Sequence, residues 1–241
     1  MTNIWSKLSK TYAEGISTTE YILLPNVARA LDNVDGKSLL DVGCGYGLFS
    51  SFFGQRGARV LGIDSSKKMV DLAKKVSPKA HYEAMDVTKV SQLNQDFDYV
   101  LAVMVFCTLN NPQDFYNAFR EISCVMKPKG RFVLVDEHPA SKKNLETAVL
   151  KRQFPENSYF NSGQPYRVLL STEKGSEVSF DNYQWTLEDY ANTIRNFNLE
   201  IIGIKEPRPS PKTCQEHPEL IYFLENPEYI LFDIQKREKD A

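Results

Sequence analysis

The chain has 241 residues, of which 42% are hydrophobic and 25% charged, a composition typical of a globular protein with one large core. Its formal net charge of −2 and isoelectric point near 6.0 argue against a dominantly basic surface. We therefore expect neither nucleic acid nor a membrane as partner. Its four cysteines form no CxxC pair, so we expect no metal site, and without a signal-peptide pattern we expect a cytoplasmic protein.

The first part of the chain alternates strand and helix patterns, as a parallel sheet with crossover connections does. We predict strands over residues 38–42, 58–64, 80–86, 97–105 and 131–138. Helices are predicted over residues 46–57, 65–76, with Ser65 or Ser66 as N-cap, and 114–126. The segment "KPKG" is predicted to be the turn before the fifth strand.

The pattern changes after His138. Residues 139–185 are polar and aromatic without a long period, which indicates an insertion or cap with short elements. A helix over 186–198 and strands over 199–207 and 229–236 follow. The Pro-rich stretch between these strands has no helical pattern, so they are predicted to pair antiparallel. The resulting fold is α/β, a Rossmann-like, seven-stranded, mostly parallel sheet with helices on both faces.

The stretch "LLDVGCGYGLFS", residues 39–50, runs from a buried strand into three closely spaced glycines. No lysine follows them, as a P-loop would require, and Leu48 occupies the third glycine position of a dinucleotide fingerprint. Asp41, within the strand end, would repel a pyrophosphate but suits an ammonium group. Asp64 follows the second strand and suits a ribose, and Asp86 follows the third strand and suits an adenine amino group. Together these groups describe S-adenosylmethionine.

From these residues onward the chain resembles the class I S-adenosylmethionine-dependent methyltransferases. "LLDVGCGYG", "VLGIDSS", "YEAMDV", "FDYVLAVMVFCTLNN" and "EISCVMKPKGRFVLV" are similar to successive motifs of that family, over roughly residues 39–135. "EHP" and "WTLEDYANTIRNFNLEIIGIKEP" are similar to bacterial members that act on small molecules. The resemblance implies S-adenosyl-L-methionine as cofactor, S-adenosyl-L-homocysteine as product and a single methyltransferase domain over residues 1–241.

The resemblance also implies roles for individual residues. It implies a cofactor site formed by Tyr12, Asp41, Gly43, Gly45, Asp64, Ser65, Met69, Asp86, Val87, Ala102 and Val103. Residues 1–36 are expected to form a helical cover over the cofactor, and residues 139–185 a cap over the acceptor. Core packing is the alternative for any single neighbour, such as Met69.

Methyl transfer requires little beyond positioning, but an oxygen or nitrogen acceptor must also lose a proton. His138, just after the fifth strand, is our candidate general base, and a turn histidine is the alternative. Neither His81 nor His217 is favoured, and no acid–base group is assigned at Cys107 and Thr108. For the acceptor pocket we expect aromatic side chains, some of which merely pack: Tyr21, Tyr159, Tyr166, Tyr183 and Trp185.

We therefore predict a methyltransferase that acts on an oxygen or nitrogen of a small-molecule acceptor. The alternatives are methylation of a carbon centre, of RNA or of protein, and a non-catalytic module that binds S-adenosylmethionine. The sequence has no basic rim and lacks the (N/D)PP(Y/F) motif of amino-group methylation on nucleic acid after the fourth strand. The sequence does not determine the oligomeric state.

Overall fold

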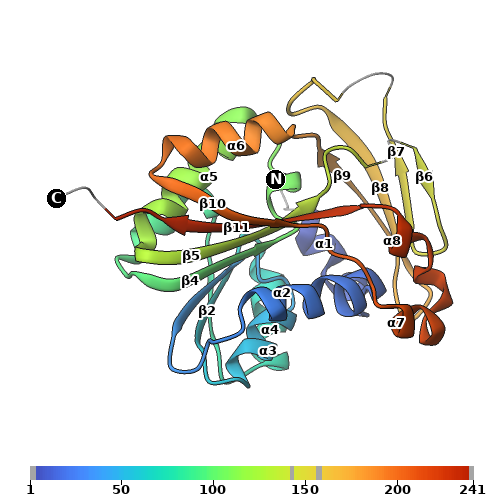
Figure 1. Ribbon diagram of the computed structural model, residues 1–241. Coiled ribbons are helices and arrows are strands. Elements are labelled where there is room, and N and C mark those ends of the chain that lie inside the picture. The colour runs from blue at the N-terminus through green and yellow to red at the C-terminus, as the bar shows by residue number, and fades with distance from the viewer. Residues whose placement is uncertain (1–3, 142–143, 156–158, 239–241) are drawn as a thin grey trace.

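The computed structural model describes residues 4–141, 144–155 and 159–238, which form two β-sheets flanked by helices (Figure 1). Residues 1–3 of the predicted cover and residues 142–143 and 156–158 of the predicted cap lie outside the described part. Among the described residues, no helix combines the length and the apolarity needed to cross a bilayer.

The larger sheet has seven strands in the order β10-β11-β5-β4-β1-β2-β3. Their bounds are β1 Ser38–Val42, β2 Arg59–Asp64, β3 His81–Ala84, β4 Phe97–Val103, β5 Met126–Glu137, β10 Leu199–Lys205 and β11 Tyr229–Lys236. The five strands from β1 to β5 are parallel to one another, and β11 lies antiparallel to both β5 and β10. The predicted mostly parallel sheet with a final antiparallel pair is confirmed.

Helices cover both faces of this sheet because its strands are apolar on both sides (Figure 1). In β1, Leu39 belongs to a core shared with α2 and α3, and Leu40 to a second core shared with α5 and α6. The helices are α2 Leu24–Ala30, α3 Leu48–Gly54, α4 Lys67–Val76, α5 Pro112–Val125 and α6 Leu187–Asn196. Three short helical segments of other kinds are a π-helix over Thr19–Leu23 (η1) and 3-10 helices over Val87–Leu93 (η2) and Phe106–Thr108 (η3).

Several element boundaries differ from the sequence prediction, most clearly where α5 passes into β5. Ser66 caps α4 as expected, since its side chain accepts a hydrogen bond from the backbone N–H of Met69 at 3.3 Å. Met126, however, has extended backbone angles and begins β5 rather than ending α5. The predicted "KPKG" turn therefore lies within β5, where Lys129 has a φ of +59° and the register with β4 is irregular.

The sequence showed no helical pattern between the last two strands, so no helix was predicted there, and this was wrong. Three short helical elements lie there: α7 Pro211–Glu216, η4 Pro218–Leu220 and α8 Tyr222–Glu225. Ser210 caps α7 and Pro211 opens it, but one or two turns are too short to show an apolar period. These elements do not form a crossover, so the antiparallel pairing of β10 and β11 still holds.

The second sheet lies beside one end of the larger sheet and has the order β6-β7-β8-β9 (Figure 1). Its strands are β6 Leu145–Glu146, β7 Leu150–Gln153, β8 Pro165–Ser171 and β9 Glu177–Tyr183, all paired antiparallel. We call it the cap sheet. Leu150, Val168, Leu170 and Phe180 are buried on it and join the core that contains α2 and α3. The N-terminal helix α1, Ile4–Tyr12, contacts both β9 and α4 and thereby bridges the two sheets.

Candidate active site

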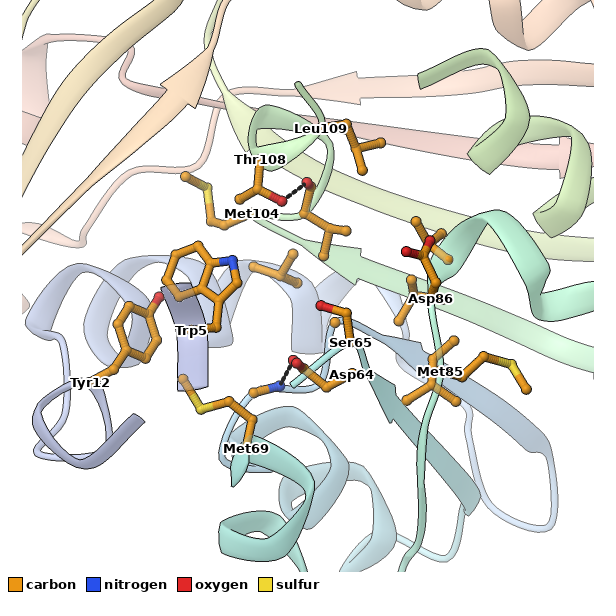
Figure 2. A pocket seen from close by; sticks show the side chains of 17 residues that line it. Trp5, Tyr12, Asp64, Ser65, Met69, Met85, Asp86, Met104, Thr108 and Leu109 are labelled. Atoms are coloured by element: carbon orange, nitrogen blue, oxygen red, sulfur yellow. Dashed lines mark hydrogen bonds between the residues drawn. The ribbon is translucent and has the colours of Figure 1, made fainter. Parts of the chain in front are cut away.

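The carboxyl ends of the parallel strands surround a cavity of about 130 Å³, which we call the strand-edge cavity (Figure 2). Its walls come from α1, the ends of β1, β2 and β4, and the segments that follow β2, β3 and β4. It is lined by Trp5, Tyr12, Val42, Gly43, Gly45, Ile63, Asp64, Ser65, Met69, Met85, Asp86, Val87, Val103, Met104, Val105, Thr108 and Leu109. Nine of the eleven residues predicted at the cofactor site lie here.

The turn after β1 is compact because its glycines take left-handed backbone angles. Gly43 has a φ of +66°, and a Cβ atom there would lie 2.4 Å from Cγ2 of Val105. Neither the backbone angle nor the space allows a larger side chain. The turn thus presents bare backbone to the strand-edge cavity.

Asp64 joins this turn to the end of β2. Its Oδ2 accepts the backbone N–H of Gly45 at 3.0 Å, and its Oδ1 accepts the backbone N–H of Ser66 at 2.8 Å. Burial raises the pKa of the Asp64 carboxyl, and the two hydrogen bonds oppose this shift. Each oxygen keeps a further lone pair with which the carboxylate can accept a ligand hydroxyl.

Asp86 lies at the far side of the cavity, where η2 begins (Figure 2). Its Oδ1 accepts both the backbone N–H of Thr88 at 2.9 Å and the Thr88 hydroxyl at 2.8 Å. These bonds hold the carboxyl beside Met85 and Val87, two apolar lining residues. A carboxyl group that accepts hydrogen bonds between apolar walls suits a flat heterocycle that carries an amino group.

The N-terminal helix closes the cavity from the opposite side. Trp5 and Tyr12 of α1 lie next to each other (Figure 2), with ring centroids 5.7 Å apart. Trp5 also packs on Phe180 of the cap sheet at 4.8 Å. The hydroxyls of Ser6 and Ser66 lie 2.8 Å apart and join α1 to the start of α4. Burial raises the pKa of Tyr12 to about 12.

Two residues predicted at the cofactor site point elsewhere. Asp41 is only 2% exposed and accepts a hydrogen bond from the Ser50 hydroxyl of α3 at 2.6 Å, while burial raises its pKa to about 7. Ala102 is buried in the core on the α5 side of the sheet. Val103, the last residue of β4, lines the cavity, whereas Ala102, one position earlier, does not. Neither Asp41 nor Ala102 is part of the cavity wall.

A second, smaller cavity of about 30 Å³ lies beneath the cap sheet, and we call it the cap cavity. It is lined by Trp5, Tyr12, Thr18, Thr19, Leu23, Met104, Cys107, Thr108, Glu137, Leu150, Val168, Leu170, Phe180, Asn182 and Tyr229. Trp5, Tyr12, Met104 and Thr108 also line the strand-edge cavity, so the two cavities adjoin. Burial raises the pKa of the Cys107 thiol well above its usual value, so the thiol is neutral.

The aromatic residues predicted to contact the acceptor line neither cavity. Tyr21 stacks on His217 with ring centroids 3.7 Å apart. Trp185 stacks on Phe115 and donates a hydrogen bond to the carbonyl of Phe106 at 3.0 Å. The hydroxyl of Tyr159 lies 3.4 Å from the backbone N–H of Leu187, outside both cavities.

Tyr166 and Tyr183 lie nearer but still outside the cap cavity. The Tyr166 hydroxyl donates to Glu137 at 2.5 Å from behind the cavity wall. Tyr183 lines an open trough of about 540 Å³, the entrance trough, whose wall includes Trp5, Thr108 and Phe180. The cap cavity is thus mainly aliphatic on its cap side, because the larger aromatic rings fill the layer behind it.

His138 also lies outside both cavities. Its Nδ1 accepts the backbone N–H of Ala140 at 3.1 Å, and its Nε2 lies 3.4 Å from Oε1 of Glu206. Burial lowers its pKa, against the opposing effect of Glu206. This geometry favours the alternative role, that of a turn histidine.

Sequence reasoning missed several lining residues, notably Trp5, Met104, Glu137 and Asn182. Trp5 precedes Tyr12 by seven residues, and this helical spacing places both on one face of α1. Within the predicted cover, that spacing could have identified Trp5 as a further lining residue. Glu137 and Asn182 meet only because β5 ends beneath the cap sheet, which no local pattern indicates.

Comparison with known proteins agrees with this geometry. A family model described as a methyltransferase domain matches residues 40–134, the span from β1 to β5 that carries the strand-edge cavity. This match shows that the chain carries a methyltransferase domain and is a methyltransferase. Solved structures of S-adenosylmethionine-dependent methyltransferases, some with that cofactor bound, share its fold.

Relatives of this methyltransferase extend beyond the matched domain. An N-demethylindolmycin N-methyltransferase of Streptomyces griseus is 23% identical over 82% of this chain and 86% of its own length. A ubiquinone biosynthesis O-methyltransferase of Coxiella burnetii is 30% identical over 68% of this chain and 60% of its own length. The methyltransferase also shares its fold with a crystal structure from Listeria monocytogenes, described as a putative S-adenosylmethionine-dependent methyltransferase. The TM-score is 0.69 and the identity 24%, and the alignment covers 89% of this chain and 96% of that one.

Proposed function

We propose that this methyltransferase transfers the methyl group of S-adenosylmethionine to an oxygen or nitrogen of a small-molecule acceptor bound in the cap cavity. The observation that carries the proposal is the junction of the two cavities. Trp5, Tyr12, Met104 and Thr108 line both, so a cofactor in one and an acceptor in the other meet at these side chains. Enclosure beneath the cap sheet favours a small molecule over a polymer.

The strand-edge cavity suits the proposed cofactor residue by residue. We assign the amino acid portion to Gly43 and Gly45, whose bare backbone leaves room, the ribose to Asp64 and Ser65, and the adenine to Asp86 and Val87. Met69 and Val103 add apolar walls, and Tyr12 closes the cavity from α1. When bound, S-adenosylmethionine supplies a methyl group on a positively charged sulfur.

In this proposal the chain acts mainly by positioning. Trp5, Tyr12 and Met104 exclude water from the junction and hold the reacting groups in line. Thr108 donates its hydroxyl to the Val105 carbonyl at 2.6 Å, and a neutral hydroxyl is too weak a base to take a proton from the acceptor. An acceptor that binds as a neutral amine needs no base, whereas a hydroxyl must also lose its proton.

The entrance trough gives no support to an RNA acceptor. Its charged lining residues are Asp86, Asp114 and Asp181 against Arg167, an acidic surplus that would repel phosphates. The Streptomyces and Coxiella relatives named above carry small molecules in their names, one an N- and the other an O-methyltransferase, which supports the same substrate class. We also propose that the chain is one methyltransferase domain with residues 1–36 as cover and 139–185 as cap.

The test is a turnover assay with methyl-labelled S-adenosylmethionine, offered separately to a library of small amines and alcohols, to total RNA and to a protein extract. Mass spectrometry of the labelled products then identifies the acceptor atom. We expect label on a small-molecule nitrogen or oxygen, and at subsaturating cofactor much less label with the Asp64→Ala variant. Label in RNA, in protein or on a carbon centre, or no transfer to any pool, overturns the proposal.

A further inference from the structure

Asn182 is a polar side chain of the cap cavity with a buried and unused hydrogen-bonding group. It lies on β9, is 1% exposed, and its Nδ2 donates to Oε1 of Glu137 at 2.9 Å. Its Oδ1 is buried and has no hydrogen-bond partner among the residues that the structure describes. A buried amide oxygen without a partner is costly, so a ligand that supplies a donor gains affinity there.

The orientation of the Asn182 amide is fixed by its neighbour. Because Nδ2 of Asn182 donates to Glu137, the Asn182 NH₂ faces Glu137 and the amide oxygen faces away from it. Glu137 is itself held by two further donors: its Oε2 accepts the Tyr166 hydroxyl at 2.5 Å and Nη1 of Arg152 at 3.1 Å. The carboxylate therefore acts as a rigid anchor for the amide.

Charge behind this anchor opposes an anionic ligand. Arg152 is 1% exposed and is shared between Glu137 and Glu228, with a further bond from its Nη1 to the Ser141 hydroxyl. One guanidinium thus faces two carboxyl groups, and Arg152 does not line the cap cavity. His138 adds none, because burial lowers its pKa.

We infer that the cap cavity selects acceptors that carry an N–H or O–H donor, which binds Oδ1 of Asn182 while the rest of the molecule lies against apolar walls. The inference rests on the proposed function for the identity of the cap cavity as the acceptor site. The apolar body would pack on Leu150, Val168 and Leu170 of the cap sheet. Glu137 is a positioning residue in this arrangement, because it fixes the amide and touches the ligand only through it.

The experiment measures binding, so it does not depend on turnover. The protein is saturated with S-adenosylhomocysteine and titrated with four probes of similar size: aniline and phenol, which carry a donor, toluene, which has no polar group, and benzonitrile, which only accepts. The NMR signal of the Trp5 indole reports occupancy of the junction, and it is easily assigned because the chain has only two tryptophans.

We expect wild-type protein to bind aniline and phenol about 10- to 100-fold more tightly than toluene or benzonitrile, as expected for one buried hydrogen bond. The ratio of the aniline and phenol affinities shows whether the cavity prefers an N–H or an O–H donor. Asn182→Leu should bind all four probes within about threefold of one another. The matched substitution Asn117→Leu on α5, which lines neither cavity, should keep the wild-type order.

Glu137→Gln provides a second, opposite test. If the new side-chain amide at this position keeps its oxygen toward Arg152 and Tyr166, it presents its NH₂ to Asn182. The Asn182 amide then turns over and offers N–H to the cavity. This variant should prefer benzonitrile to aniline and phenol.

Equal wild-type affinity for toluene and the donor probes overturns the inference. So does a donor preference that survives in a folded Asn182→Leu variant. If Asn182→Leu does not fold, the Glu137→Gln variant decides: an unchanged preference for donors overturns the inference. The labelled turnover assay tests the proposed function separately, so either can fail while the other holds.

Discussion

Oδ2 of Asp64 accepts the backbone N–H of Gly45 at 3.0 Å, which joins the end of β2 to the glycine turn that follows β1. The same carboxyl accepts the backbone N–H of Ser66, where α4 begins. One side chain thus organises three elements around the strand-edge cavity and also remains available to a ligand. Its removal should affect both cofactor affinity and the local backbone.

The first prediction concerns this carboxyl. Asp64→Ala should weaken S-adenosylmethionine binding by at least about tenfold, since hydrogen bonds to a charged group contribute about 1.5–3 kcal/mol each. Calorimetric titration measures the effect. Asp71→Ala is the control, because Asp71 is an exposed carboxyl on α4 that lines neither cavity. Unchanged affinity in a folded Asp64→Ala protein contradicts the assignment.

The second prediction separates backbone strain from lost space. Gly43 and Gly36 have φ of +66° and +67°, so alanine at either position costs about 1–2 kcal/mol of left-handed strain. Only at Gly43 does the new Cβ meet a neighbour, Cγ2 of Val105 at 2.4 Å, whereas nothing lies within 4 Å at Gly36.

Gly43→Ala should therefore lose more stability than Gly36→Ala and bind the cofactor at least about tenfold more weakly. Gly36→Ala should bind as wild type does. Urea unfolding and calorimetric titration of the two variants give the comparison. Equal cofactor affinity in both variants would show that the turn at Gly43 does not need its bare backbone.

The third prediction concerns pH. Burial raises the pKa of Asp41 from 3.8 to about 7, and that of Asp136 likewise to about 7. Between pH 4 and 7 the native state therefore binds more protons than the unfolded chain, and the free energy of unfolding should fall as pH rises. One group contributes up to about 1.4 kcal/mol per pH unit, and the decline should level off above pH 7.

Asp41→Asn should remove part of this dependence. Its amide oxygen can still accept the Ser50 hydroxyl, but it carries no charge to desolvate. The stability of the variant relative to wild type should rise from pH 5 to pH 8, measured by urea unfolding without cofactor. A wild-type stability that increases over this range contradicts the prediction.

The fourth prediction concerns His138. Asn can accept the Ala140 N–H in its place, so His138→Asn should keep kcat within about threefold of wild type and keep the pH–rate profile. The measurement uses the acceptor that the labelled assay identifies. A fall of about 10²- to 10⁴-fold with unchanged cofactor affinity would restore His138 as a general base.

The sequence by itself was sufficient to predict the larger sheet and most of the strand-edge cavity. Buried strands such as Ser38–Val42 have a local apolar signature, and ligands of parallel sheets bind at the carboxyl ends of the strands. Gly43, Asp64 and Asp86 each follow or end one of the parallel strands, so their meeting follows from topology alone. Asp41 and Ala102 lie one position before the last residues of β1 and β4, and neither is part of the cavity wall.

Only the tertiary structure determined the cap cavity. Glu137 and Asn182 are separated by 45 positions and meet because the cap sheet packs over the end of β5, a packing that no local period encodes. The aromatic residues Tyr166, Tyr183 and Trp185 were reasonable pocket candidates by composition, but the cap needs large side chains to fill its own interior. Tyr166 and Trp185 are buried away from the cavity, and the aliphatic residues Leu150, Val168 and Leu170 face it. Which residues face it depends on which face of each strand packs inward.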